Sequence, residues 1–151
     1  MNALRYTLGA TTVFALAACG DNQVPAQADD MWRSIQETRY REFTRAPGFE
    51  TRKPSNAAHG DAVDIFVNKT VADAIAAKKP LTAWPLGSLI VKDGYSDGSL
   101  KFVAVMEKRS DGWFWAEYDE EGSALYSGKP SLCIDCHRSG QDSVRAFGLP
   151  K

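Results

Sequence analysis

The chain of 151 residues has no excess of charge of either sign, because 18 lysines and arginines nearly balance 19 aspartates and glutamates. Proteins that bind nucleic acid or an anionic membrane surface through charge carry a basic patch or a high positive net charge. No uncharged apolar run reaches the ~18 residues needed to cross a bilayer. The sequence also lacks a glycine-rich phosphate loop and an HExxH helix. We therefore expect neither a nucleic-acid partner nor a membrane-spanning helix.

Cysteine is scarce: there are three, at positions 19, 133 and 136. An odd number cannot be used up by internal disulfides. A domain of this length buries roughly two-thirds of its unfolded surface and folds without a disulfide framework. One cysteine lies near the N-terminus and two near the C-terminus, so we expect two separate roles.

The first residues have the parts of an export signal. An uncharged apolar segment follows Arg5 and ends in the small-residue sequence LAACG, which contains Cys19. This sequence resembles a bacterial lipobox, in which the cysteine is lipidated and becomes the mature N-terminus. We predict a signal peptide over 1–18 and a lipidated Cys19 with a polar tether over 19–30. The alternative is an ordinary signal peptide that is cut near the same position.

The third segment, 31–151, is predicted to be one domain of the α+β class. A helix is expected over 31–43 after Asp30, and a second over 69–79, capped by Asn68. Five segments have the β-branched and aromatic composition of strands, and short Asp, Ser and Gly turns separate the last four into an antiparallel meander. These strands are expected at 63–68, 88–93, 101–109, 112–119 and 123–128. The tail is predicted as a loop over 132–140 and a short helical segment over 141–149.

The motif that carries chemistry is C-x-x-C-H, formed by Cys133, Cys136 and His137. Two thiols at this spacing can add to the two vinyl groups of one haem, and the adjacent imidazole can bind the iron. A structural zinc site needs four ligands, and the only other histidine is His59. The same two thiols could instead form a thioredoxin-like redox pair or a small strained disulfide. Because the chain has an export signal, we favour covalently bound haem c.

Four segments together resemble the cytochrome P-460 family, which includes the cytochrome c′-beta proteins: HGDAVDIFVN, WPLGSLIVKDG, FVAVMEKRSDGWFWAEYD and CIDCHRSGQDSV. The resemblance implies a largely antiparallel β fold with a few helices packed around one c-type haem. By matching positions, Cys133 and Cys136 hold the haem and His137 is the proximal iron ligand. Lys92 matches the family lysine that is linked covalently to the haem macrocycle in cytochrome P-460 itself.

The resemblance leaves more than one activity open. Charged distal positions of hydroxylamine-oxidising members fall at Val63 and near Ala104 here, which favours binding of a small uncharged ligand such as nitric oxide. Oxidation of hydroxylamine at a Lys92-linked haem is the enzymatic alternative. A pure electron-transfer cytochrome would need Met106 or His59 as a sixth ligand. A core position for Met106 and a turn position for His59 are the competing interpretations.

The expected partners follow from these assignments. We expect a small diatomic or nitrogenous ligand, a periplasmic redox protein, and the membrane through a lipid anchor at Cys19; a homodimer is a further candidate. We expect the protein on the periplasmic side of a bacterial cell envelope. Gly20, rather than Asp, follows the cysteine, which favours the outer over the inner membrane.

Overall fold

The structure is a computed structural model, and it describes residues 22–151. The predicted signal peptide over 1–18 and Cys19 lie outside the described residues. The helices are α1 (Pro25–Glu37), the 3-10 turn η1 (Tyr40–Glu42), α2 (Lys69–Ala76) and α3 (Ser131–His137). The strands are β1 (Thr44–Arg45), β2 (Lys53–Pro54), β3 (Ala62–Val67), β4 (Leu89–Ser96), β5 (Ser99–Arg109), β6 (Gly112–Asp119) and β7 (Ala124–Gly128). Within residues 22–151, no helix has the length and apolarity to cross a bilayer.

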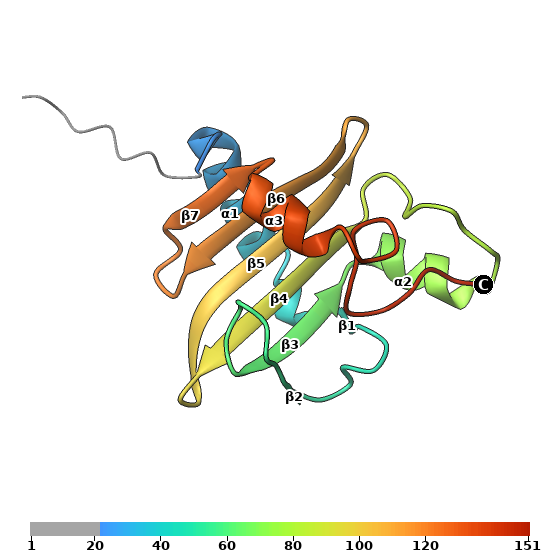
Figure 1. The fold of residues 1–151 in the computed structure, drawn as a ribbon, viewed down its shortest axis with the longest axis horizontal. Coiled ribbons are helices and arrows are strands. Elements are labelled where there is room, and N and C mark those ends of the chain that lie inside the picture. The colour runs from blue at the N-terminus through green and yellow to red at the C-terminus, as the bar shows by residue number, and fades with distance from the viewer. Residues whose placement is uncertain (1–21) are drawn as a thin grey trace, which may run out of the picture.

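The strands form one sheet of seven, in the order β1-β3-β4-β5-β6-β7, with β2 also paired to β3. Every pairing is antiparallel, and Figure 1 shows the long strands β3 to β7 following one another across the sheet. Asp97 and Gly98 connect β4 to β5 with φ of +51° and +77°, as a type I′ hairpin turn requires. The predicted α+β class with an antiparallel meander is confirmed.

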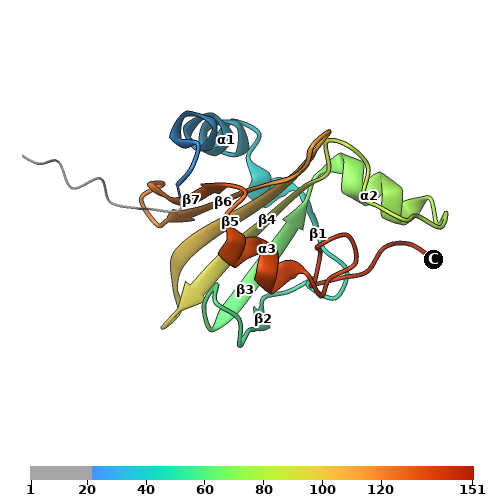
Figure 2. The ribbon, with the colours of Figure 1, turned by 45° about the horizontal axis from the view of Figure 1, so that its top comes forward.

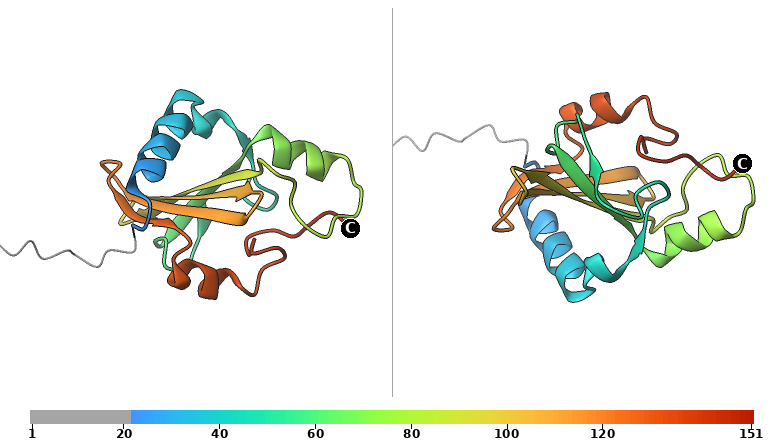
Figure 3. Two further views of the ribbon diagram at one scale, coloured as in Figure 1. Left: turned by 90° about the horizontal axis from the view of Figure 1, so that it is seen from above. Right: turned by 90° about the horizontal axis from the view of Figure 1, so that it is seen from below.

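The sheet carries a separate apolar layer on each face. Helix α1 covers one face, whereas α3 and the C-terminal tail lie over the other (Figures 2 and 3). Alternation along the strands supplies both layers, because successive side chains point to opposite faces. The layer under α1 consists of Ala28, Met31, Ile35, Tyr40, Phe66, Val91, Val103, Val105, Phe114, Ala116 and Tyr118. The layer on the opposite face consists of Ala46, Val63, Ile65, Val67, Val71, Trp84, Ile90, Met106, Trp113, Trp115, Val144 and Phe147.

Helix α1 begins six residues earlier than the sequence suggested, at Pro25 instead of Met31. The predicted tether over 19–30 is therefore wrong for residues 25–30, which are helical. Proline is favoured in the first helical turn because its missing N–H has no intrahelical partner there. Ala28 is fully buried, and its carbonyl accepts a 2.7 Å hydrogen bond from the Tyr118 hydroxyl. This packing against β6 stabilises a polar segment that has no helical signal of its own.

The C-terminal prediction is also corrected. Residues 131–137, expected within or beside a loop, form helix α3, and the expected helical segment over 141–149 is not helical. Asn68 caps α2 as predicted, because its side chain accepts a hydrogen bond from the backbone N–H of Val71.

Two buried carboxylates, Asp64 and Asp93, lie directly opposite each other on β3 and β4. Arg45 and Arg52 both hydrogen-bond to Asp64. Asp93 accepts hydrogen bonds from the Tyr40 hydroxyl at 2.6 Å and from Nε of Arg41 at 2.7 Å. Burial, and then the hydrogen bond to Asp93, raises the pKa of Tyr40. Each carboxylate is thus compensated separately, as buried charges require.

We predict that Asp64 stabilises the fold only above acidic pH. Burial alone would raise its pKa, but the hydrogen bonds from Arg45 and Arg52 outweigh burial and lower it. A lowered carboxyl pKa contributes stability that is complete above the usual range and is lost as the pH falls through the folded-state value. Replacing Asp64 by Asn should lower the free energy of unfolding by roughly 1–3 kcal/mol at pH 7. Urea denaturation should show this difference shrinking towards pH 3.

The exposed pair Lys69–Asp73 on α2 provides the control, since both side chains are largely in solvent. Replacing Asp73 by Asn should change the unfolding free energy by less than about 0.5 kcal/mol at either pH. The electrostatic explanation would be contradicted if the loss of unfolding free energy in Asp64→Asn stayed constant from pH 7 to pH 3.

Candidate functional site

Helix α3 places the three residues of the C-x-x-C-H motif together. Side chains three and four positions apart lie on the same face of a helix, so Cys133, Cys136 and His137 project in similar directions. Cys133 and His137 are half-buried, and Cys136 is exposed. The helix itself contributes no buried residue to the core. It therefore presents the motif at the edge of the space between α3 and the sheet.

His137 has one ring nitrogen occupied and one available. Its Nδ1 lies 2.9 Å from the backbone carbonyl oxygen of Ser143, and because a carbonyl only accepts, Nδ1 carries the proton. Burial lowers the pKa of His137 to about 4, so the ring is neutral at pH 7. The Nε2 atom then carries the lone pair that can bind a metal. The ring also packs edge-on against Trp115, with 4.7 Å between centroids.

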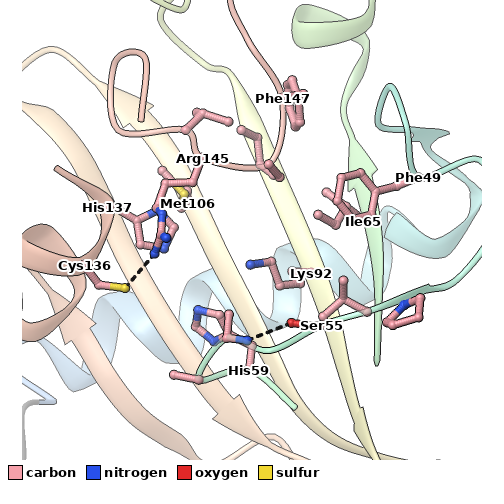
Figure 4. A pocket seen from close by; sticks show the side chains of 17 residues that line it. Phe49, Ser55, His59, Ile65, Lys92, Met106, Cys136, His137, Arg145 and Phe147 are labelled. Atoms are coloured by element: carbon pink, nitrogen blue, oxygen red, sulfur yellow. Dashed lines mark hydrogen bonds between the residues drawn. The ribbon is translucent and has the colours of Figure 1, made fainter. Parts of the chain in front are cut away.

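Two adjoining cavities, of about 240 and 370 Å³, open beside this histidine. Figure 4 shows the side chains around the first of them, with His137 and Cys136 at one side. Both cavities are lined by Ala58, His59, Ile90, Lys92, Met106, Cys136 and His137. The first is closed further by apolar residues such as Phe49, Ile65 and Phe147, and the second by Phe102, Ala104, Leu125, Leu132 and Cys133. The combined space is mostly apolar and bordered by the motif.

Lys92 lines both cavities and does not extend into solvent from a strand end (Figure 4). Register explains this position, because Lys92 lies between Ile65 on β3 and Ala104 on β5 on the apolar face. Burial lowers the pKa of Lys92, and Arg145 lowers it further, although Glu117 acts in the opposite direction. The structure therefore brings Lys92 together with Cys136 and His137.

Glu117 is a cavity residue that the sequence analysis missed. It follows Ala104 in the same cross-strand row, and its Oε2 lies 2.6 Å from Nδ1 of His59, although the ring N–H is not aligned for a hydrogen bond. The rings of His59 and His137 lie 6.3 Å apart between centroids. The sequence does show an acidic residue within an otherwise aromatic strand. However, only the pairing register of β5 and β6 shows that Glu117 faces the cavity.

Met106, Val63 and Ala104 complete the walls of the two cavities. Met106 is 8% exposed and packs in the apolar layer, as the core interpretation expected, but it also lines both cavities. Val63 lines the first cavity and Ala104 the second. Neither position supplies a charge.

We predict that Gly94 fixes the loop that carries His59. A Cβ atom at this position would overlap the carbonyl oxygen of His59, which is backbone and cannot rotate away. Replacing Gly94 by Ala should lower the free energy of unfolding by about 1–3 kcal/mol, the usual cost of overpacking, and displace His59 from Glu117. Thermal unfolding and a histidine NMR spectrum would measure these effects. Replacing Gly87 by Ala, which has open space around it but a φ of +78°, gives a control for backbone strain without displacement of His59.

These residues fit a haem. A haem needs an apolar slot that excludes water, and an imidazole whose outer nitrogen is oriented by a hydrogen bond; the cavities and His137 provide both. The model of the family described as cytochrome P460 matches residues 38–145, which include the cavity strands and the whole motif. Comparisons with curated proteins and with solved structures returned no match. The chain is thus a member of the cytochrome P460 family of haem-binding cytochromes.

Proposed function

We propose that the protein is an extracytoplasmic monohaem c-type cytochrome that binds a small uncharged ligand such as nitric oxide and exchanges electrons with a redox partner. Cys133 and Cys136 form the thioethers, and His137 is the proximal ligand. The observation that carries the proposal is the geometry of α3. One helix face aims both thiols and an oriented, neutral imidazole at the edge of an apolar cavity.

The bound haem would supply an iron centre that takes up one small ligand and changes its oxidation state. The chain supplies attachment, orientation and exclusion of water. The thiols fix the position of the group, and Ser143 fixes the tautomer and orientation of His137. Apolar walls from Phe49, Ile65 and Phe147 limit access of water.

Selectivity for an uncharged ligand rests on the composition of the walls. A charged molecule loses much solvation free energy on entering an apolar cavity unless a partner charge compensates it. Val63 and Ala104 offer no such partner, so the charged side chains of the walls are confined to Lys92 and Arg145 in the first cavity and Lys92 and Glu117 in the second. Nitric oxide and carbon monoxide carry no charge and therefore enter at little desolvation cost.

A second candidate is an electron-transfer cytochrome with two histidine ligands. The ring centroids of His59 and His137 lie 6.3 Å apart and both rings line the two cavities, which supports this candidate, because both imidazoles would be within reach of one bound haem. Met106 is the other candidate for a sixth ligand, since it lines both cavities.

A third candidate is oxidation of hydroxylamine or a related nitrogen compound at a haem linked to Lys92. The position of Lys92 inside the cavity supports this possibility, because a cross-link requires contact with the bound group. The absence of a charge at Val63 and Ala104 favours ligand binding over this chemistry.

Absorption spectra of the oxidised and reduced protein, with and without nitric oxide or carbon monoxide, separate the three candidates. We expect a haem c spectrum of the high-spin type that shifts with both gases. A low-spin spectrum indifferent to both gases, converted to high spin by His59→Ala or Met106→Leu, would establish the second candidate. A red-shifted reduced Soret band that survives denaturation and disappears in Lys92→Ala would establish the third.

We further propose that lipidation of Cys19 anchors the mature chain on the periplasmic side of the cell envelope, preferentially at the outer membrane. The anchor sequence LAACG supports this location, and more than one acyl chain per cysteine makes such anchoring stable. The electron partner would then be a periplasmic protein. A homodimer is a further candidate assembly.

A further inference from the structure

The turn that supplies the Ser143 carbonyl has an unfavourable backbone conformation. It spans Gln141 to Val144 and is closed by a 3.1 Å hydrogen bond from the N–H of Val144 to the carbonyl oxygen of Gln141. Its two central residues, Asp142 and Ser143, have φ of +45° and +65°. Residues other than glycine rarely adopt such values, and they do so where surrounding contacts hold them.

Three parts of the chain hold this turn through Asp142. The ammonium of Lys108, on β5, donates to both carboxylate oxygens of Asp142, at 2.7 and 2.9 Å. The backbone N–H of Trp84 donates to Oδ2 at 2.8 Å. The indole N–H of Trp113, on β6, donates to the backbone carbonyl of Asp142 at 2.8 Å. The conformation of the turn is therefore fixed from outside, by the sheet and by the loop before β4.

The ion pair is shielded from solvent, with the side chains of Lys108 and Asp142 only 15% and 16% exposed. Removing two charges from water costs free energy that their attraction does not always recover, so such a pair need not add to the stability of the fold. The pair does fix the position of Asp142. Asp142 precedes Ser143, and the Ser143 carbonyl is the partner of His137 Nδ1.

We propose that Lys108 and Asp142 are positioning residues that hold the Ser143 carbonyl on Nδ1 of His137 and so strengthen the bond from His137 to the iron. The inference rests on the proposed role of His137 as proximal ligand. A hydrogen bond from the second ring nitrogen fixes the orientation of a ligating histidine and raises its basicity. A more basic imidazole donates more electron density, which lowers the reduction potential of the metal.

The test replaces Lys108 by Met in the haem-loaded protein, which removes the charge but keeps an unbranched side chain against Trp113. The iron–histidine stretching band of the reduced protein should move to lower frequency, and the midpoint potential should rise. The potential also reports the effect if a sixth ligand suppresses the band. The matched control is Lys101→Met on the same strand, which breaks the exposed pair with Glu120 and should leave both quantities at the wild-type values.

Two further variants separate positioning from folding. Asp142→Asn weakens the interaction with Lys108 while keeping a side chain that tolerates positive φ, and it should shift both quantities in the same direction as Lys108→Met. Lys108→Arg keeps the charge and should restore most of the wild-type values. The positioning role is wrong if His137 ligates the haem of the wild-type protein but Lys108→Met and Asp142→Asn both have the same band frequency and midpoint potential as Lys101→Met. If the wild type carries no His137-ligated haem, the proposed function fails and this inference with it.

Discussion

Replacing both Cys133 and Cys136 by serine is expected to abolish covalent retention of haem completely, and either single replacement should leave one thioether. The two thiols are three positions apart on α3, so both face the same cavity edge. A serine hydroxyl matches the shape of the thiol but does not add to a vinyl group under the same conditions. Haem staining after denaturing electrophoresis and the pyridine haemochrome spectrum measure the number of intact thioethers directly.

The third cysteine provides a matched control for these replacements. Cys19→Ser should remove the predicted lipid anchor and release the protein from the membrane fraction, and it should leave both thioethers intact. Two covalent links surviving in Cys133→Ser or in Cys136→Ser would overturn the attachment proposal. Loss of haem in Cys19→Ser alone would show that export or anchoring limits attachment.

Much of the sheet was predictable from the sequence because its signals are local. β6 has the predicted bounds, Gly112–Asp119, and β5 begins two residues before the predicted start. Alternating apolar residues and short turns define such strands without reference to the rest of the chain. The start of α1 was missed because Ala28 and its neighbours are held by Tyr118, which lies 90 residues away in sequence. A tertiary contact of this kind has no local signal.

The motif on α3 was identified although its helix was not. Leu132 and Ile134 are 59% and 39% exposed, so this short helix lacks the buried apolar stripe by which helices are predicted. The spacing of Cys133, Cys136 and His137 was sufficient because it reports the chemistry of the attached group and not the local fold. Lys92 could be identified as a site residue only through the family resemblance, because its burial depends on strand pairing.

The residues around His137 show where prediction from sequence ended. Glu117 reaches the cavity because β4, β5 and β6 pair in one particular register. Asp142 and Ser143 form a turn with two positive φ values and no central glycine, so these residue types indicate a turn but not its left-handed conformation. These contacts join segments far apart in the sequence, and they determine the hydrogen bond that orients His137.

Replacing His137 by glycine is expected to abolish proximal ligation while the haem stays attached through Cys133 and Cys136. The iron–histidine stretching band should disappear, and the spectrum of the carbon monoxide adduct should change. The variant loses the packing on Trp115 and the hydrogen bond to Ser143, but the protein should stay folded, because α3 contributes no fully buried residue to the core. Added imidazole can occupy the space left by the side chain, and its second ring nitrogen can donate to the Ser143 carbonyl as Nδ1 of His137 does. It should therefore restore much of the original spectrum.

The matched control is His59→Gly, because His59 lines the same two cavities and its ring lies 6.3 Å from that of His137. If His137 alone binds the iron, this variant keeps the iron–histidine band and the response to both gases. If both histidines bind, His59→Gly converts a low-spin spectrum to high spin and creates gas binding that the wild type lacks. A His137→Gly protein that retained the wild-type band would assign the proximal position to another residue, and His59 would be the first to examine, because it is the other imidazole that lines both cavities among residues 22–151.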